Sequence, residues 1–241
     1  MTRNEKIKFV TLRSIGNFLV LFALFGVIAT FGPAVTTEAT YRVAQARGIE
    51  YSVEDLRQLT PGQESEVADP GEDEGPTFGS VLAGPKEQIL TAKDTDFSIV
   101  IPKIGASAKI IPNVDPTKET EFIPALQDGI AHAKGTVFPG MDGKVYLFAH
   151  STDSWWNVGR YNAIFYLLKD LEPGDDIVVF FEGRRYNYVV KEKKIADPSD
   201  VSFFRESQVG PQQLVLQTCW PPGTTWKRLF VIADLKSDTP N

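Results

Sequence analysis

The sequence predicts a mainly β fold: a closed or nearly closed β-barrel with short helices, preceded by one transmembrane helix and an acidic linker. Three observations predict it: an uncharged apolar run near the N-terminus, a proline- and glycine-rich acidic stretch, and six short β-like runs further on. Many short strands favour a barrel because closure leaves no exposed edge. We divide the chain into a cytoplasmic N-terminus (1–13), an anchor (14–37), a flexible spacer (38–85) and an extracytoplasmic domain (86–241).

The predicted anchor carries no formal charge. Its apolar part, Ile15 to Val35, is long enough to cross a hydrocarbon layer of about 30 Å at about 1.5 Å per residue. By the positive-inside rule, basic residues before the run keep the N-terminus in the cytoplasm and export everything after Thr37; they are Arg3, Lys6, Lys8 and Arg13. A cleaved signal peptide is the alternative, but its apolar part spans only about 7–15 residues, so an uncleaved anchor is favoured.

The predicted spacer is strongly acidic. Between Glu50 and Glu74 there are nine acidic residues and one basic residue, Arg57, which gives a net charge of 1 − 9 = −8. Apolar residues are too sparse there to build a core, and proline–glycine pairs interrupt the stretch. These features are typical of an extended, self-repelling linker that lets a domain reach beyond the membrane surface.

Composition excludes several classes of protein. The formal net charge is 25 − 31 = −6 and no basic run occurs, so nucleic acid is not an expected partner. One cysteine and two histidines exclude a disulfide framework and the Cys/His-rich zinc modules. We therefore expect no cofactor.

The β-like runs are separated by turn residues. They are Phe97–Ile101, Lys144–His150, Asp176–Phe181, Arg185–Lys191, Gln213–Cys219 and Arg228–Leu235. The third and fourth flank Glu182-Gly183, which predicts a hairpin. Short helices are expected between Asn162 and Leu171 and around Pro124 to Gln127.

Cys219 is the first candidate for chemistry. It ends a strand and precedes Trp220-Pro221-Pro222, a backbone that cannot continue a strand ladder, so deep burial as a structural cysteine is disfavoured. A thiol needs a nearby base or cation to become a good nucleophile at neutral pH. His150 also stands where a strand gives way to a polar loop, whereas His132 lies in a turn-rich stretch typical of a structural histidine. We therefore favour His150 as the partner of Cys219.

Arg228 is the third candidate. Attack of a thiolate on a carbonyl builds negative charge on oxygen, which a guanidinium with its forked donors can stabilise. Arg228 opens the strand that follows the Cys219 loop, so the two strand ends meet if the strands are neighbours. Lys227 alternates to the other face. The competing arginines, which we expect on surface loops, are Arg160, Arg184 and Arg185.

These residues lie in motifs that resemble the sortase family, the membrane-anchored cysteine transpeptidases of bacterial surfaces. Val215-Leu-Gln-Thr-Cys219 is similar to the family's Thr-Leu-X-Thr-Cys strand, and Arg228-Leu-Phe-Val231 to its Arg-Leu-hydrophobic-Val strand. Gly129-Ile-Ala-His-Ala-Lys-Gly-Thr136 resembles a segment whose histidine is not catalytic in the family. The resemblance runs in order over Phe97 to Leu235.

The resemblance implies an eight-stranded barrel and a transpeptidase. Cys219 would cleave a Leu-Pro-X-Thr-Gly-like sorting signal of a surface protein through a thioacyl enzyme. His150 would protonate the leaving amine and Arg228 would hold the substrate and its oxyanion. The acceptor would be an amine, either a peptidoglycan cross-bridge or a pilin lysine. Thr218 and Trp220, the neighbours of Cys219, are expected to contact the substrate.

The sequence also departs from the family's pattern. Val215 replaces threonine, and Ala149 replaces the glycine that commonly precedes the catalytic histidine, which affects the shape of the substrate groove. No second apolar span follows Leu235 and no Asp-Pro-aromatic lid motif occurs in the spacer, so we expect a single-anchor enzyme and not the pilus-polymerising class. Some family members bind calcium near the positions of Asp197, Asp200 and Glu206, but scattered carboxylates are more typical of a surface.

Two other functions stay open at this point. A thiol hydrolase of the cell envelope would use the same residues and admit water in place of an amine. A membrane-tethered binding domain would keep the barrel without turnover, which the joint presence of Cys219, His150 and Arg228 disfavours.

Overall fold

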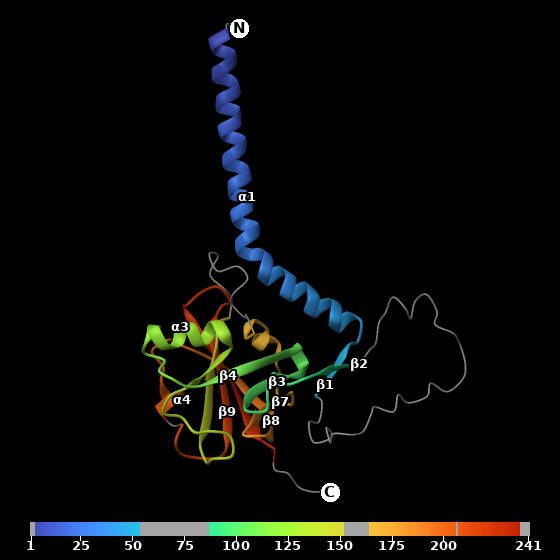
Figure 1. Cartoon of the computed structure of the whole chain (residues 1–241), viewed down its shortest axis with the longest axis vertical. Coiled ribbons are helices and arrows are strands. Elements are labelled where there is room, and N and C mark those ends of the chain that lie inside the picture. The colour runs from blue at the N-terminus through green and yellow to red at the C-terminus, as the bar shows by residue number, and fades with distance from the viewer. Residues whose placement is uncertain (1–2, 54–86, 152–163, 206, 237–241) are drawn as a thin grey trace, which may run out of the picture.

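The computed structural model describes residues 3–53, 87–151, 164–205 and 207–236. Among them, eight strands form one closed barrel in the order β10-β8-β7-β3-β4-β5-β6-β9 (Figure 1). The strands are β3 (Phe97–Ile101), β4 (Ala106–Val114), β5 (Ile130–Ala133), β6 (Lys144–Phe148), β7 (Asp176–Phe181), β8 (Arg184–Ala196), β9 (Gln213–Trp220) and β10 (Lys227–Leu235). The predicted closed, mainly β barrel is therefore confirmed.

The barrel holds one large apolar core. Its strands bring together fully buried aliphatic and aromatic side chains, including Ile99, Leu147, Leu216 and Val231. Each such side chain contributes about 1.5–3 kcal/mol when it leaves water. Buried residues on both faces of several strands explain why the sequence shows apolar runs there and little alternation.

The predicted hairpin is confirmed: β7 and β8 pair antiparallel, with Phe181 opposite Arg184. The strand β8 is longer than predicted. The strands β4 and β5 were not predicted; they run parallel to each other, and α3 (Glu119–Asp128) connects them. Parallel neighbours need such a crossover because a tight turn only joins antiparallel strands. This helix contains the segment for which we predicted a short helix, Pro124 to Gln127.

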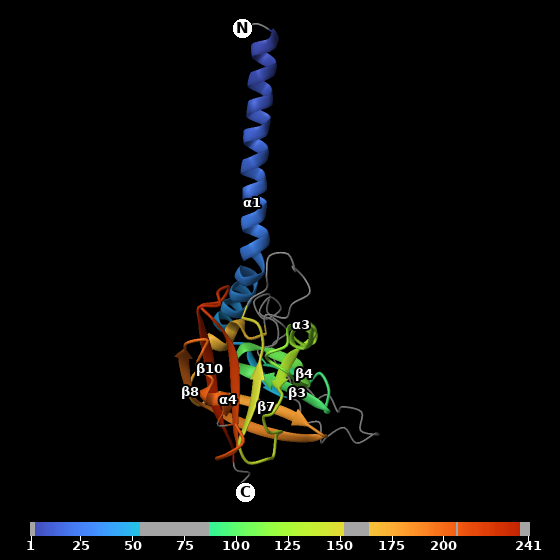
Figure 2. The same cartoon turned by 90° about the vertical axis from the view of Figure 1, so that its left-hand side faces the viewer.

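The remaining short helices surround the barrel (Figure 2). They are η2 (Pro102–Ile104), η4 (Tyr166–Asp170) and α4 (Ser202–Arg205). The 3₁₀ helix η4 falls within the predicted helical segment, whose first residues, 162 and 163, lie outside the described residues. It belongs to the connection from β6 to β7, the same connection that contains His150.

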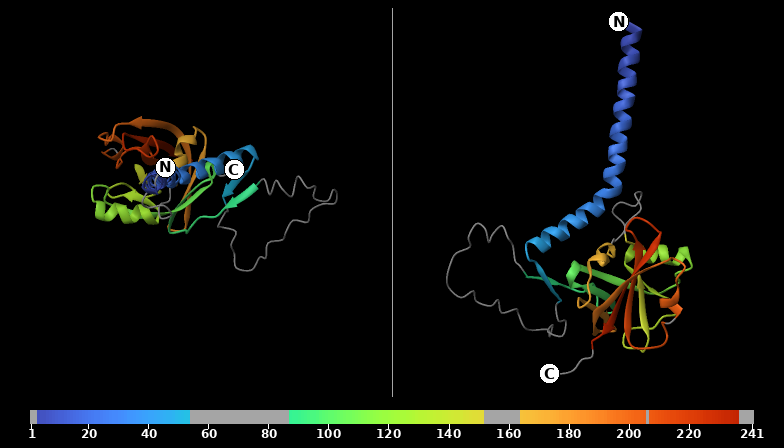
Figure 3. Two further views of the ribbon diagram at one scale, coloured as in Figure 1. Left: turned by 90° about the horizontal axis from the view of Figure 1, so that it is seen from above. Right: turned by 180° about the vertical axis from the view of Figure 1, so that it is seen from behind.

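The N-terminal helix α1 (Arg3–Ala46) is longer than the predicted anchor. Within the described residues, its portion Arg3–Ala29 is long and apolar enough to cross a membrane by length and composition. The helix bends partway along and its second part lies against the barrel (Figures 1 and 3). Pro33 lies in its interior, and proline bends helices because it lacks a backbone N–H.

The described ends of the predicted spacer are structured, which corrects the expectation of an extended chain there. Residues 38–46 belong to α1, and β1 (Glu50–Val53) pairs in parallel with β2 (Glu87–Leu90). The cause is tertiary packing: Tyr41 and Ala44 are buried, and Val53 packs with Leu90 against a small apolar cluster on the barrel. The rest of the spacer, residues 54–86, lies outside the described residues.

Candidate active site

The register of two neighbouring strands brings Arg228 and Cys219 together. The antiparallel strands β9 and β10 pair so that Arg228 lies directly opposite Cys219. Opposed residues in such a pair point to the same face, with their Cβ atoms about 4.5–5.5 Å apart. Cys219 is half-buried and lies one residue before the end of β9. The predicted meeting of the two strand ends is thus present in the fold.

The guanidinium of Arg228 is held by the loop between β9 and β10. Its Nη1 atom donates to the carbonyl oxygens of Thr225 and Lys227, each at 3.2 Å. Among the described residues, no carboxylate lies within ion-pair distance of Arg228. Its positive charge is therefore not neutralised by those residues and can act on an anionic group near Cys219.

His150 reaches the same end of the barrel through β6. The strands β6 and β9 run parallel, with Phe148 opposite Gln217, so both leave the sheet at one end. The N–H of Ala149 donates to the carbonyl of Gln217 at 3.2 Å. Burial lowers the pKa of His150 below its ordinary value, so the imidazole is neutral at pH 7. A neutral imidazole can accept a proton there.

The structure brings Cys219, His150 and Arg228 to one end of the barrel, which we call the rim. The competing arginines do not reach it. Arg184 and Arg185 begin β8, whose opposite end, Ala196, is the part that pairs with Arg228. Arg160 lies outside the described residues. Lys227 points away, as predicted: it is exposed and its Nζ atom forms an ion pair with Asp197 at 2.7 Å.

Thr218 is placed differently from the expectation of substrate contact. Its side chain is buried, at 2% exposure, and its hydroxyl donates to the carbonyl of Ala149 at 3.0 Å. The alternation of a strand turns it away from the side that Cys219 faces. We therefore assign Thr218 a positioning contact: it ties β9 to the residue immediately before His150. Trp220 is half-buried and packs against the core, and its contact with substrate stays a prediction.

Replacing Thr218 by valine removes this hydrogen bond while it keeps the shape of the side chain. On the transpeptidase activity that the sequence resemblance implies, acyl transfer should slow by about tenfold, because the lost buried hydrogen bond, about 1–1.5 kcal/mol, no longer ties β9 to the residue before His150. Steady-state kinetics with the sorting-signal peptide that the same resemblance implies measures this. Thr218→Ser, which retains the hydroxyl, is the control and should keep most of the rate. Equal rates for the valine variant and the wild type would contradict the positioning contact.

Sequence reasoning missed a polar pair beside the rim. The hydroxyl of Tyr146 donates to the side-chain oxygen of Gln217, two residues before Cys219 and on its side of the strand. Burial raises the pKa of Tyr146, so its phenol stays protonated and acts as a donor. The available signal was Gln217 itself, a polar residue that directly follows the apolar run Leu214 to Leu216.

His132, the other histidine, is fully buried and its ring is bonded on both sides. The N–H of Asn113 donates to Nδ1 at 3.3 Å, so the proton sits on Nε2, which donates to the carbonyl of Val137 at 3.1 Å. Burial lowers the pKa of His132. A charged ring would carry an N–H at Nδ1 as well, which would face the backbone N–H of Asn113. These contacts agree with the predicted structural role of His132.

The lowered pKa of His132 predicts that stability depends on pH. Below about pH 6.5 the unfolded chain binds a proton that the folded barrel takes up only at lower pH, so the free energy of unfolding falls as the pH drops. Thermal unfolding of the full chain in detergent between about pH 7.5 and 5 should show a decreasing melting temperature. His132→Gln should lower stability at pH 7.5 and weaken this dependence, of which the buried His150 retains its own part. A wild-type melting temperature that rises on acidification would contradict the prediction.

The three carboxylates considered for calcium are engaged elsewhere or not described. Asp197 pairs with Lys227, and Asp200 accepts the N–H of Ser202 at 3.0 Å. Glu206 lies outside the described residues. In the parts of the chain that the structure describes, no group of three or more His, Cys, Asp or Glu side chains could hold a metal ion.

A barrel whose rim carries a cysteine, a histidine and an arginine on neighbouring strand ends is the arrangement that the sequence motifs predicted. The model of the sortase domain family matches residues 99–236, more than half of the chain. The chain therefore belongs to the sortase family.

Two relatives illustrate the likeness. Sortase D of Bacillus subtilis (strain 168) is 26% identical over 121 residues, which are 50% of this chain and 52% of that protein, so the match spans about half of its length. The solved structure of sortase C1 of GBS Pilus Island 1 has a TM-score of 0.50 at 21% identity, over 60% of this chain and 66% of that one. At this identity the second likeness shows the fold alone.

Proposed function

We propose that this protein is a cysteine transpeptidase of the cell surface. It would cleave a Leu-Pro-X-Thr-Gly-like sorting signal at the Thr–Gly bond and join the threonine carbonyl to an amine acceptor. The observation that carries the proposal is the register that sets Arg228 opposite Cys219 while the parallel strand β6 delivers His150 to the same rim. Membership of the sortase family implies this class of reaction.

The first half-reaction forms a thioester. The neutral imidazole of His150 takes the proton of the Cys219 thiol and becomes an imidazolium. The sulfur attacks the threonine carbonyl carbon, and the charge that develops on oxygen is stabilised by the guanidinium of Arg228. The C–N bond to glycine then breaks as the imidazolium of His150 gives its proton to the leaving amine. The glycine-bearing fragment departs and the threonine stays bound to the sulfur.

The second half-reaction releases the product. The acceptor amine attacks the thioester carbonyl, His150 takes the proton from its nitrogen, and the thiolate of Cys219 leaves. The lowered pKa of His150 favours the neutral form that this proton acceptor needs. The acceptor class is an amine, such as a peptidoglycan cross-bridge or a pilin lysine, and the donor is a surface protein.

The protein would act on the outer side of a cell membrane. The apolar segment Arg3–Ala29 supports a single anchor, and the basic residues near its start support a cytoplasmic N-terminus. With the anchor so oriented, the barrel faces the extracytoplasmic space where sorting signals and cell-wall amines occur.

A peptide-library cleavage assay with mass spectrometry tests the proposal. The full chain in detergent is mixed with peptides that vary around Leu-Pro-X-Thr-Gly, with and without triglycine as the amine. We expect a thioacyl adduct on Cys219 and, with the amine, a ligated product. Release of free acid alone, with the amine ignored, would favour a hydrolase; no adduct with any peptide would overturn acyl transfer.

Arg228→Ala is expected to slow adduct formation by about 10²–10³-fold, because one oxyanion donor is lost at the rim. The matched control is Lys227→Ala, which removes a neighbouring positive charge that pairs with Asp197 on the exposed side. Rapid-quench mass spectrometry measures both rates. If the two variants slowed the reaction equally, Arg228 would have no specific part in acyl transfer.

A further inference from the structure

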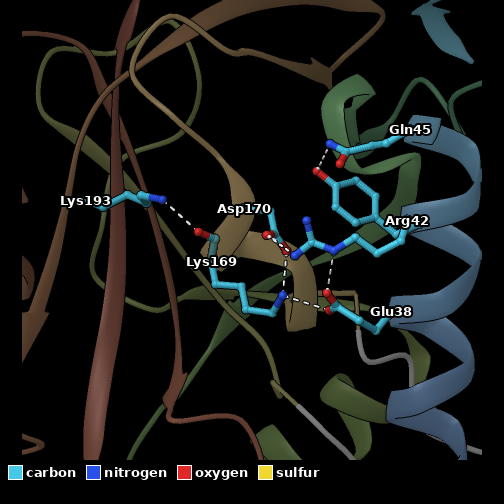
Figure 4. A network of polar contacts seen from close by, with 7 residues as sticks. Glu38, Arg42, Gln45, Lys169, Asp170 and Lys193 are labelled. Carbon is cyan, nitrogen blue, oxygen red and sulfur yellow. Dashed lines mark hydrogen bonds and ion pairs between the residues drawn. The ribbon is translucent and has the colours of Figure 1, made fainter. Parts of the chain in front are cut away.

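A ring of four alternating charges joins the N-terminal helix to the barrel. Two of its members, Glu38 and Arg42, lie one turn apart on α1, and the other two, Lys169 and Asp170, lie in η4 (Figure 4). Lys169 Nζ contacts Glu38 at 2.8 Å and Asp170 at 2.6 Å. Arg42 contacts Glu38 at 2.9 Å and Asp170 at 3.4 Å. Every charge therefore has two partners of opposite sign.

The ring is partly shielded from water. The side chains of Lys169 and Asp170 are 20% and 18% exposed and Glu38 is 29% exposed, whereas Arg42, at 57%, lies on the solvent side. The hydrogen bond from Lys169 is the largest cause that holds the pKa of Glu38 below its ordinary value. Lys193 of β8 donates to the carbonyl of Lys169 at 2.7 Å, which connects the ring to the barrel wall. Charges in such a network hold geometry better than isolated surface pairs.

Apolar packing accompanies the ring. Tyr41 and Ala44, on the same part of α1, are each only 7% exposed. The hydroxyl of Tyr41 accepts from Gln45 at 2.6 Å, and the guanidinium of Arg42 stacks over its ring at 5.7 Å. The second part of α1 is thus docked by both burial and charge, unlike the first part, whose candidate membrane span is fully exposed in the protein.

The docked second part of α1 sets the orientation of the barrel relative to the membrane anchor. The strand β10 runs from the rim at Lys227 to Leu235, and its last residues lie at the end of the barrel away from the bend of α1 (Figure 1). The connection between β9 and β10 therefore lies at the barrel end that faces the bend of α1, and the view from behind agrees (Figure 3). A membrane crossed by the first part of α1 would lie on that side.

We propose that residues 38–46 are a docking helix that fixes the barrel to its anchor with the rim of Cys219 turned toward the membrane surface. The inference rests on the membrane anchorage of the proposed function, but not on its chemistry. The rim would face the surface of a lipid bilayer. The site would therefore act on polypeptide segments that lie close to the membrane surface. Glu38, Arg42, Lys169 and Tyr41 are the residues that hold this orientation.

Energy transfer to the bilayer surface tests it with the full chain in phosphatidylcholine vesicles. Cys219 is the only cysteine, so a thiol-reactive donor labels the rim alone, and acceptor headgroups are placed in the outer leaflet. The comparison probe is Met141→Cys in a Cys219→Ala background; Met141 is 54% exposed at the opposite end of β6 from His150. We expect clearly greater transfer from position 219 than from position 141. Equal transfer, or greater transfer from position 141, would overturn the orientation.

The docking helix is tested by variants of the ring. Glu38→Gln with Arg42→Gln changes only α1 and leaves the barrel sequence intact, and Tyr41→Ala removes the buried ring. Both should abolish the difference between the two probes. The matched control, Lys236→Met, breaks an ion pair with Asp176 away from α1 and should preserve the difference. A difference that persists in both docking variants would overturn the role of the helix. The experiment measures a distance and not an activity. It therefore supports or overturns the orientation even if the protein does not transfer peptides.

Discussion

Cys219→Ala is expected to abolish acyl transfer, with a loss of at least about 10⁴-fold that reaches the uncatalysed background. The substitution removes the sulfur that would carry the thioester, and no other thiol can replace it, since Cys219 is the only cysteine. Intact-mass spectrometry after incubation with a sorting-signal peptide should show the adduct on the wild type and none on the variant.

The fold should survive this change. Cys219 lies half-buried at the end of β9, and alanine fills the position without adding volume. The melting temperature of Cys219→Ala is therefore expected to stay close to that of the wild type. The same variant is then a suitable background for the Met141→Cys probe of the energy-transfer experiment. Full transfer activity in this variant would rule out the thioester mechanism.

His150→Ala is expected to slow both half-reactions by about 10²–10⁴-fold, because the leaving amine loses its proton donor and the incoming amine loses its base. The wild-type profile of kcat/KM against pH should contain a limb below the ordinary histidine value of about 6.5, since burial lowers the pKa of His150. That limb should be missing from the variant. Stopped-flow kinetics at several pH values measures it.

Added imidazole provides the control for His150. The cavity left by the alanine substitution can admit a free imidazole, which should restore part of the rate if the missing function is proton transfer. Restoration would also show that the barrel has not collapsed. If His150→Ala kept the wild-type rate and pH profile, His150 would not be the acid–base residue.

The sequence predicted the strands whose signal is local. The strands β3 and β7 begin and end where their apolar runs do, and β9 and β10 extend only one residue further. The strand β4 escaped prediction because small residues and Pro112 break its pattern, and Asn113 has a positive φ where its register with β5 shifts. Residues 38–46 were assigned to the spacer because only their contacts with the barrel reveal that the helix continues.

The rim was predictable for a different reason. Each of its three residues stands where an apolar strand meets a polar loop, and that junction is visible in the chain. Their proximity depends on strand order, and the parallel pairing of β6 with β9 has no local signal because it joins distant segments. The positioning contact of Thr218 had no local signal for the same reason: its bond to Ala149 exists only across that pairing.

The parallel pairing of β6 with β9 also determines when a newly made chain can become active. Sixty-nine positions separate Thr218 from Ala149 along the chain, so the two segments meet only after the strands between them have been arranged. On the proposed function, the polypeptide would cross the membrane before the barrel closes, when Cys219 and His150 are not yet held at one end of it. The protein would therefore be inactive during export and become active outside the membrane, once the barrel has folded.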